Sequence, residues 1–167
     1  SSGMIFLEKG GTQILNVLER IQNKYKNRIK LTIISRIQPD KEFTRTNEND
    51  KEFVIRFIEE NNNWIKHYKN IDNDKVLEIA KDADIGLLPT IQDTYGYSVL
   101  EMQAAGVPCI TTNVRALPEI NKAGWICKIP INKYGEALYS KETSLNKINK
   151  ILERELEKTI VEILENP

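Results

Sequence analysis

The sequence predicts an α/β fold, in which a doubly wound parallel sheet carries helices on both faces and a long helix follows at the C-terminus. Two observations lead to this class. Short β-branched runs alternate along the chain with segments whose apolar residues recur at helical spacing, and strands that alternate with helices form parallel sheets buried on both faces. Residues 143–165 then carry a single apolar stripe at helical spacing, which is typical of a long amphipathic helix.

Length, charge and cysteine content narrow the possible functions. A chain of 167 residues has the size of one globular domain. The 24 basic and 24 acidic residues give a formal net charge of 0, so charge offers no reason to expect a nucleic-acid partner or an acidic membrane surface. No apolar run approaches the ~20 residues of a transmembrane helix. Cys109 and Cys127 form no metal or redox motif, and we expect both to be buried thiols.

The first half of the chain is expected to alternate helix and strand. Positions from Ile14 to Ile21 show helical spacing after Thr12, a residue type that often caps a helix. The β-branched run at 30–36 predicts a buried strand, and the polar stretch 37–50 predicts an exposed loop. The other predicted elements are a helix with apolar positions at 53–58, a strand at 64–69, a helix after Asp72, strands at 85–88, 108–112 and 125–129, and helices at 99–105 and 118–122.

The C-terminal helix has two possible roles. Its apolar stripe either packs on the rest of the domain, which is the ordinary outcome for a terminal helix, or binds a partner as a coiled coil. The stripe consists of Leu145, Ile148, Leu152, Leu156, Ile160 and Leu164.

The segment from residue 89 to residue 108 holds the most informative pattern. Asp93 and Glu101 are separated by seven residues, and Gly96 lies in the turn between them. A short apolar helix is expected to begin at or near Glu101, and a helix N-terminus offers unpaired N–H groups and partial positive charge to a phosphate. Carboxylates beside it accept hydrogen bonds from hydroxyl groups, which sugars and riboses carry. The pattern predicts a nucleotide-sugar site beyond the carboxyl ends of the strands.

An ordered series of motifs from about residue 4 to about residue 128 resembles one family. That family is the glycosyl transferases group 1 (family 4) type, retaining enzymes with the two-domain GT-B fold. The matching motifs are, in order, Lys9-Gly10-Gly11, Asp93, Tyr95-Gly96, Glu101, Ala104-Ala105-Gly106, Pro108, Cys-Ile-Thr-Thr at 109–112, and Leu117-Pro118-Glu119-Ile120.

The resemblance implies a role for each matching residue. Glu101 would accept hydrogen bonds from both ribose hydroxyls, and Asp93 would contact the transferred sugar. Lys9, with the backbone at Gly10 and Gly11, would hold the diphosphate, so that Lys9 and Asp93 would be the catalytic residues. Backbone N–H groups of Tyr95, Gly96, Tyr97 and Ser98 would contact the phosphates and the sugar, and the base would meet the backbone of residues 68–72.

The same resemblance implies the context of the site. Residues 1–167 would form a single Rossmann-like, nucleotide-sugar-binding domain, the C-terminal half of a GT-B enzyme whose N-terminal acceptor domain is absent. Transfer would retain the anomeric configuration, with no metal and with no cofactor besides the nucleoside-diphosphate sugar itself. The acceptor would be a saccharide or a lipid-linked saccharide, in a pathway such as polysaccharide biosynthesis. The enzyme would be cytoplasmic, or peripheral to the membrane at full length.

The sequence departs from the family pattern in three places. Asp93 stands where glutamate is usual, Met4 stands where arginine is usual, and Arg115-Ala116 replace two glycines. These departures favour a second hypothesis, a nucleotide-sugar-binding module without catalytic activity. A third hypothesis is a sugar-nucleotide epimerase of the GT-B type, which would form its product without an acceptor.

Each singled-out residue also has a structural alternative. Lys9 and Asp93 have an alternative as ordinary turn residues, and Glu101 as a glutamate favoured by the positive end of a helix. His67, the single histidine, is expected to be structural. Glu119 is expected to cap its own short helix, with a contact to the sugar donor as the alternative.

Overall fold

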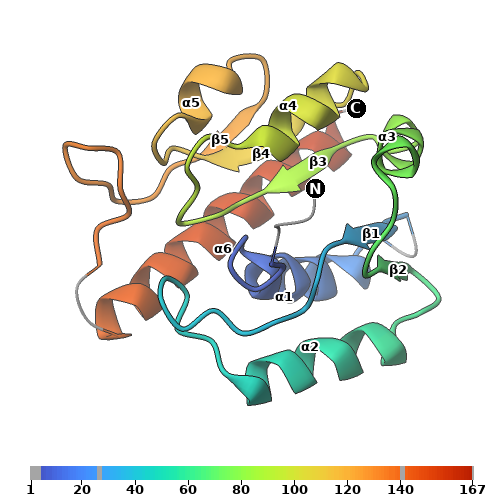
Figure 1. Cartoon of the computed structure of the whole chain (residues 1–167), viewed down its shortest axis with the longest axis horizontal. Helices are drawn as coiled ribbons and strands as arrows, with labels where there is room; N and C mark the ends of the chain where they lie inside the picture. Colours follow the sequence, from blue (N-terminus) through green and yellow to red (C-terminus); the bar gives the residue numbers. More distant parts are fainter. Residues whose placement is uncertain (1–4, 26–27, 140–141, 167) are drawn as a thin grey trace.

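The strands form two parallel ladders, as Figure 1 shows. The computed structural model describes residues 5–25, 28–139 and 142–166. The ladders consist of β1 (Leu31–Ile34) paired with β2 (Ile65–Tyr68), and of β4 (Cys109–Thr112) between β3 (Gly86–Leu88) and β5 (Trp125–Cys127). Because every ladder is parallel and helices connect the strands, the predicted α/β class is confirmed.

The segment before the first helix joins the two ladders. Ile5 forms a parallel bridge with Arg36, just beyond β1, and the Phe6 N–H donates to the Arg36 carbonyl oxygen at 2.9 Å. On its other side, the Thr90 hydroxyl, which lies just beyond β3, donates to the Glu8 carbonyl oxygen at 3.3 Å. Residues 5–8 therefore hold the carboxyl ends of β1 and β3 together.

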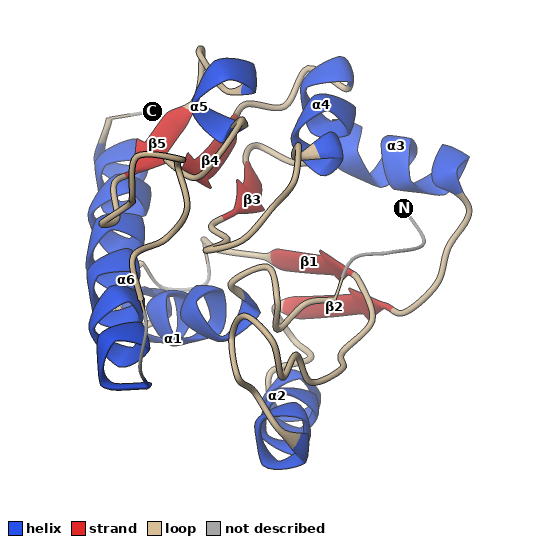
Figure 2. Ribbon diagram, turned by 60° about the vertical axis from the view of Figure 1, so that its left-hand side comes forward, coloured by secondary structure: helices blue, strands red, loops and turns tan. Residues whose placement is uncertain are grey.

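Helices cover the ladders on both sides (Figure 2). The long C-terminal helix packs against the first helix and contacts β5, whereas the two helices around β3 pack together on the opposite side. The helices are α1 (Gly11–Gln22), α2 (Glu48–Glu60) against β2, α3 (Asn73–Lys81), α4 (Tyr97–Ala104) against β3 and β4, α5 (Leu117–Ile120) against β4, and α6 (Glu142–Glu165). None of the helices in the described ranges is long and apolar enough to cross a membrane.

Helix α6 packs on its own domain, so the packed-helix prediction is confirmed. Arg20 of α1 forms ion pairs with Glu153 at 3.2 Å and with Glu157 at 2.8 Å, and the Tyr25 hydroxyl donates to Glu165 at 2.8 Å. These polar contacts lie beside an apolar interface between α1 and α6. The interface shields the apolar stripe of α6 from water. The buried residues of the stripe are Leu145, Ile148, Leu152, Leu156 and Ile160, and Leu164 is partly buried.

A buried asparagine fixes the chain beyond α4. Asn121 is fully buried, and its Nδ2 donates to the carbonyl oxygens of Cys109 and Trp125 and to the Thr111 hydroxyl, at 3.1, 3.2 and 3.0 Å. Its Oδ1 accepts from Gln103 Nε2 at 3.2 Å. Because Gln103 belongs to α4, this network ties α4 to the ends of β4 and β5, and it satisfies polar groups that would otherwise be costly to bury.

Two predicted cap residues have other roles. Helix α1 starts at Gly11, and its N-cap is Gly10 in the left-handed conformation, with φ 82°. Thr12 therefore lies in the first turn, where its buried hydroxyl has no hydrogen-bond partner in the described part of the chain. Glu119 does not cap α5, because the N-cap is Ala116 and Glu119 lies inside the helix. Both predictions were wrong because the helices begin before these residues.

Helix α2 begins earlier than its apolar positions predicted. The Asn47 side chain accepts from the Asp50 N–H at 3.4 Å, and the Asp50 carboxylate accepts from the Asn47 N–H at 2.7 Å. This reciprocal capping box fixes the start of the helix at Glu48. The loop predicted at 37–50 is thus shorter, and it is ordered around Asp40, a buried carboxylate that accepts from the backbone of the second, third and fourth residues after it.

Both cysteines are buried thiols, as predicted. Burial raises the pKa of Cys109 and of Cys127 to about 11. At pH 8 only about a thousandth of each thiol would be the reactive thiolate. We therefore expect the folded protein to resist alkylation by iodoacetamide at pH 8 and the urea-unfolded protein to react at both positions. Mass spectrometry measures the labelling. The account would be contradicted if either cysteine of the folded protein were alkylated as fast as in the unfolded protein.

Candidate functional site

Two loops meet where the strands end. One loop, residues 8–10, precedes α1, and the other, residues 89–96, follows β3. Gly10 lies so close to Pro89 that a Cβ atom on Gly10 would overlap the Pro89 carbonyl oxygen. The φ of Gly10 is 82°, a conformation that glycine adopts without steric cost. Both halves of the predicted site, distant in sequence, are therefore in direct contact.

Lys9 is held at this junction by three oxygen atoms. Its Nζ lies 2.8 Å from Glu8 Oε1, 3.0 Å from Asp93 Oδ2 and 3.3 Å from the Gln92 carbonyl oxygen. The side chain is only 17% exposed. Lys9 is thus not a solvated turn lysine, because its ammonium is fixed next to the predicted sugar-contacting residue.

The electrostatic environment keeps Lys9 charged. Burial alone lowers the pKa of Lys9, but the hydrogen bond to Glu8 and the charge and hydrogen bond of Asp93 together raise it by more. The pKa of Lys9 therefore lies above its ordinary value. The stability that this shift contributes is fully present at neutral pH and is lost only as the pH rises through the raised pKa.

Asp93 uses both carboxylate oxygens within the protein. Its Oδ1 accepts from the N–H groups of Tyr95 at 3.1 Å and Gly96 at 2.6 Å, and its Oδ2 faces Lys9. The first pair of bonds shapes the turn that leads into α4. Asp93 is therefore both a turn residue and the partner of Lys9, so that its structural and functional interpretations are compatible.

Helix α4 starts directly after this turn. Its N-cap is Gly96, with φ 78°, and a Cβ atom on Gly96 would lie 2.5 Å from Leu117 Cδ2. The N–H groups of Tyr97 and Ser98 precede the first intrahelical hydrogen bond, which Val99 donates to the Gly96 carbonyl oxygen at 2.9 Å. Of the backbone donors predicted here, those of Tyr97 and Ser98 have no acceptor within the described residues.

Helix α1 presents a second such start at the same edge. The Gly11 N–H donates to the Phe6 carbonyl oxygen at 2.9 Å, whereas the Gly10 N–H has no acceptor among the residues described. A glycine precedes each of these two helices, so no side chain caps either of them. Two helix N-termini with available N–H groups thus flank the Lys9–Asp93 pair, an arrangement that suits a phosphate chain.

An exposed aromatic pair borders the start of α4. The rings of Tyr95 and Tyr97 have centroids 5.2 Å apart with a 44° angle between their planes. Tyr95 is 47% exposed and Tyr97 is 69% exposed, whereas Ser98 is buried. The N–H groups of Tyr95 and Gly96 already donate to Asp93, so the backbone donors available to a ligand here are those of Tyr97 and Ser98.

Glu101 lies further along α4 than the sequence suggested. The helix begins at Tyr97, so Glu101 is its fifth residue, about 6 Å along the axis. Its side chain is partly buried and has no hydrogen-bond or ion-pair partner in the described ranges. Because Glu101 lies beyond the first residues of the helix, the positive charge at the helix N-terminus does not explain a glutamate at this position.

The positions that depart from the family pattern fall in different places. Arg115 has a φ of 45°, a conformation in which glycine is the residue without strain. Its guanidinium is paired with Glu136 at 2.6 Å, and its N–H donates to the Gly135 carbonyl oxygen at 2.8 Å. It therefore anchors a turn after β5 that the sequence did not predict, closed by the antiparallel bridge between residues 131 and 137. Met4 lies outside the described residues.

Glu8 is the site residue that sequence reasoning missed. It contacts Lys9 more closely than Asp93 does, through an oxygen 2.8 Å from Nζ. Its place next to Lys9 in the sequence was the available signal. His67, by contrast, is structural as predicted, with Nε2 2.8 Å from the Ser35 carbonyl oxygen.

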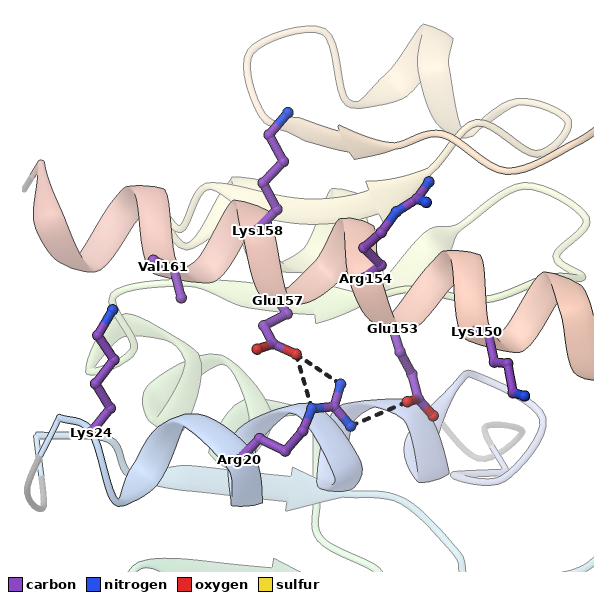
Figure 3. A pocket seen from close by; sticks show the side chains of 8 residues that line it. All are labelled: Arg20, Lys24, Lys150, Glu153, Arg154, Glu157, Lys158 and Val161. Carbon is purple, nitrogen blue, oxygen red and sulfur yellow. Dashed lines mark hydrogen bonds and ion pairs between the residues drawn. The ribbon is translucent and has the colours of Figure 1, made fainter.

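A separate groove lies between α1 and α6 (Figure 3). It is shallow, has a volume of about 540 Å³, and contains none of the predicted site residues. Its two carboxylates, Glu153 and Glu157, are bonded to Arg20, which lies toward the opposite end of α1 from Lys9. The groove thus offers no free carboxylate for sugar hydroxyls, and the chemistry expected of the site remains at the strand ends.

Acidic pairs also occur beside α3. The sequence contains Asp-x-Asp twice, at 72–74 and 82–84, and the first and last residues of both are exposed. Asp72 is the N-cap of α3 and Asp82 its C-cap. Within the described ranges, no three His, Cys, Asp or Glu side chains come together in a way that could hold a metal ion.

The parallel ladders, the two glycine-led helix starts and the long terminal helix define a class by fold, a Rossmann-like α/β domain. A solved structure of this fold is WaaG, a glycosyltransferase involved in lipopolysaccharide biosynthesis, which matches with a TM-score of 0.59 at 19% identity. The match covers 92% of this chain and 36% of that chain. The predicted fold is thereby confirmed.

The sequence gives the family itself. The model of the glycosyl transferases group 1 family matches residues 1–163, so the chain belongs to that family, as its motifs predicted. One relative is the N-acetyl-alpha-D-glucosaminyl L-malate synthase of Bacillus anthracis, 36% identical over 59 residues, which are 34% of this chain and 16% of the relative. The chain thus matches only a part of each of these longer proteins.

Proposed function

We propose that this chain is the donor-binding domain of a glycosyltransferase that takes its sugar from a nucleoside diphosphate. The observation that carries the proposal is the Lys9–Asp93 ion pair, 3.0 Å long, which fixes a cation between two helix N-termini. A nucleoside-diphosphate sugar needs positive charge at the diphosphate and carboxylates at the sugars, and this edge offers both.

In this proposal the charge of the leaving diphosphate is stabilised from both loops. Lys9 contributes an ammonium, and the N–H groups of Gly10, Tyr97 and Ser98 contribute backbone donors. Donors already in place where negative charge develops lower the barrier without reorganisation. Transfer with retention and without a metal is the form of the reaction that we propose, following the family.

The two carboxylates have separate roles. Glu101, which has no partner in the described chain, would accept hydrogen bonds from the ribose hydroxyls. Asp93 would orient the transferred sugar through Oδ2 while Oδ1 keeps the turn closed. The base would meet the backbone between the end of β2 and the start of α3, at residues 68–72.

In this proposal the acceptor binds to a part of the enzyme outside this domain. Because the chain corresponds to 36% of WaaG, we propose that a separate N-terminal domain binds a saccharide or lipid-linked acceptor. Glycosyl transfer then requires the full-length enzyme, and the 167-residue chain alone should bind nucleotide without transferring sugar.

Calorimetric titration of the chain with UDP, GDP and ADP tests the proposal. We expect one nucleotide to bind, and Glu101→Ala to remove most of that binding. The matched control is Glu59→Ala, an exposed glutamate near the end of α2, which should change nothing. Binding that survives Glu101→Ala undiminished, or no binding by any of the three nucleotides, would contradict the proposal.

Asp93 also bears on the alternative of an inactive binding module, because its side chain is already engaged by Lys9 and by the turn. Asp93→Asn keeps an oxygen for the turn and removes the negative charge beside Lys9. In the full-length enzyme we expect this substitution to lower sugar transfer by at least about 100-fold while the domain stays folded. Absence of any transfer by the wild-type enzyme would favour the inactive module, and epimerised sugar nucleotide formed without acceptor would favour the epimerase.

A further inference from the structure

The ammonium of Lys9 is surrounded by as many protein oxygens as it has N–H donors. An ammonium group carries three N–H donors. Lys9 Nζ has three oxygen atoms in range, Glu8 Oε1 at 2.8 Å, Asp93 Oδ2 at 3.0 Å and the Gln92 carbonyl oxygen at 3.3 Å. A diphosphate can therefore reach Lys9 only if one of these partners leaves.

Two of the three partners are fixed by further bonds. Asp93 is 13% exposed, and its other oxygen accepts from the N–H groups of Tyr95 and Gly96. The Gln92 carbonyl is part of the backbone and also accepts from the Thr90 hydroxyl at 2.6 Å. Moving either group would open the turn that leads into α4.

Glu8 is the partner that can leave. Its side chain is 20% exposed, and Lys9 is its sole hydrogen-bond partner in the part of the chain that the structure describes. A rotation about its side-chain bonds frees Lys9 without breaking any other hydrogen bond of the Glu8 side chain within the described residues. Glu8 also places a negative charge beside Lys9, where the diphosphate would lie, and the two negative charges would repel each other.

We propose that Glu8 is a displaceable counter-ion, which occupies Lys9 in the empty site and is replaced there by the diphosphate of the nucleotide. This rests on the proposed function. Glu8 holds Lys9 in position before the donor arrives, and it competes with the nucleoside-diphosphate product for the ammonium. Its effect is to weaken product binding and to speed product release, a step that limits the turnover of many enzymes.

Titration of Glu8→Gln with UDP, GDP, ADP and inorganic pyrophosphate tests the inference. Glutamine keeps the shape and a hydrogen-bonding oxygen but removes the charge. We expect the variant to bind the nucleotide that the wild type binds about tenfold more tightly and to release it more slowly. The difference in affinity between variant and wild type should be smaller at high salt. The matched control is Glu48→Gln, which removes the same charge from the exposed pair with Lys51 and should leave binding unchanged.

The outcomes separate this inference from the proposed function. Nucleotide binding that is equal or weaker in Glu8→Gln overturns the role of Glu8 and leaves the donor site in place. Silence of both proteins toward all four probes overturns both. A second readout uses the unmodified chain, since pyrophosphate should move the carboxyl ¹³C resonance of Glu8 toward that of a free glutamate and leave that of Asp93 nearly unchanged. A shift confined to Asp93 would mean that Asp93, and not Glu8, is displaced from Lys9, and it would refute the inference.

Discussion

Gly10→Ala is expected to lower the free energy of unfolding by about 3 kcal/mol. The left-handed φ of 82° costs a residue with a Cβ atom roughly 1–2 kcal/mol, and overlap within a packed interior adds roughly 1–3 kcal/mol. The overlapping group is the Pro89 carbonyl, which belongs to the backbone and cannot rotate away. Chemical denaturation with urea measures the loss.

A matched glycine isolates the steric part of this effect. Gly106 has a φ of 83°, nearly that of Gly10, but a Cβ atom there would meet nothing within 4 Å. Gly106→Ala should therefore cost only the conformational part, about 1 kcal/mol. Equal losses in the two variants would mean that the two loops do not approach each other as closely as the structure has them.

Lys9→Gln is expected to weaken binding of the nucleoside diphosphate by roughly 10- to 100-fold. A charge-assisted hydrogen bond to a phosphate contributes about 1.5–3 kcal/mol, and the substitution also leaves Glu8 and Asp93 facing the ligand without their cation. Calorimetry measures the affinity, and a urea curve on the same sample measures the stability. The control is Lys51→Gln on α2, which removes a partly exposed lysine paired with Glu48. Equal affinity of Lys9→Gln and the wild type would exclude Lys9 from the site.

Much of the fold could be predicted from period and residue type. The change between β-branched runs and helical spacing located the strands to within one or two residues, and the apolar stripe of the last helix matches the residues that α6 buries. The motif series also predicted that Lys9 and Asp93 lie together, although they are far apart in the sequence. Lys9 contacts the carbonyl oxygen of Gln92, the residue before Asp93, which is 83 positions further along the chain. Period and motif order succeed here because burial and topology leave a direct trace in the sequence.

Helix starts and local side-chain contacts could not be predicted in the same way. The start of α1 depends on the left-handed conformation of Gly10, and the start of α2 on a reciprocal bond between Asn47 and Asp50, in a stretch with no apolar period. The contact of Glu8 with Lys9 depends on where the chain turns between Phe6 and Gly10. These features arise from backbone angles and short-range geometry, which hydrophobic spacing does not encode.

The central claim is that nucleotide binds at the strand ends, and amide chemical shifts locate binding residue by residue. ¹H–¹⁵N spectra of the labelled chain, recorded while the best-binding nucleotide is added, should show the largest shifts at Lys9, Gly10, Gly96, Tyr97 and Ser98. Residues of the groove between α1 and α6, such as Arg20, Lys150 and Arg154, should hardly move. Shifts concentrated in that groove, with the two glycine-led helix starts unaffected, would contradict the proposed donor site.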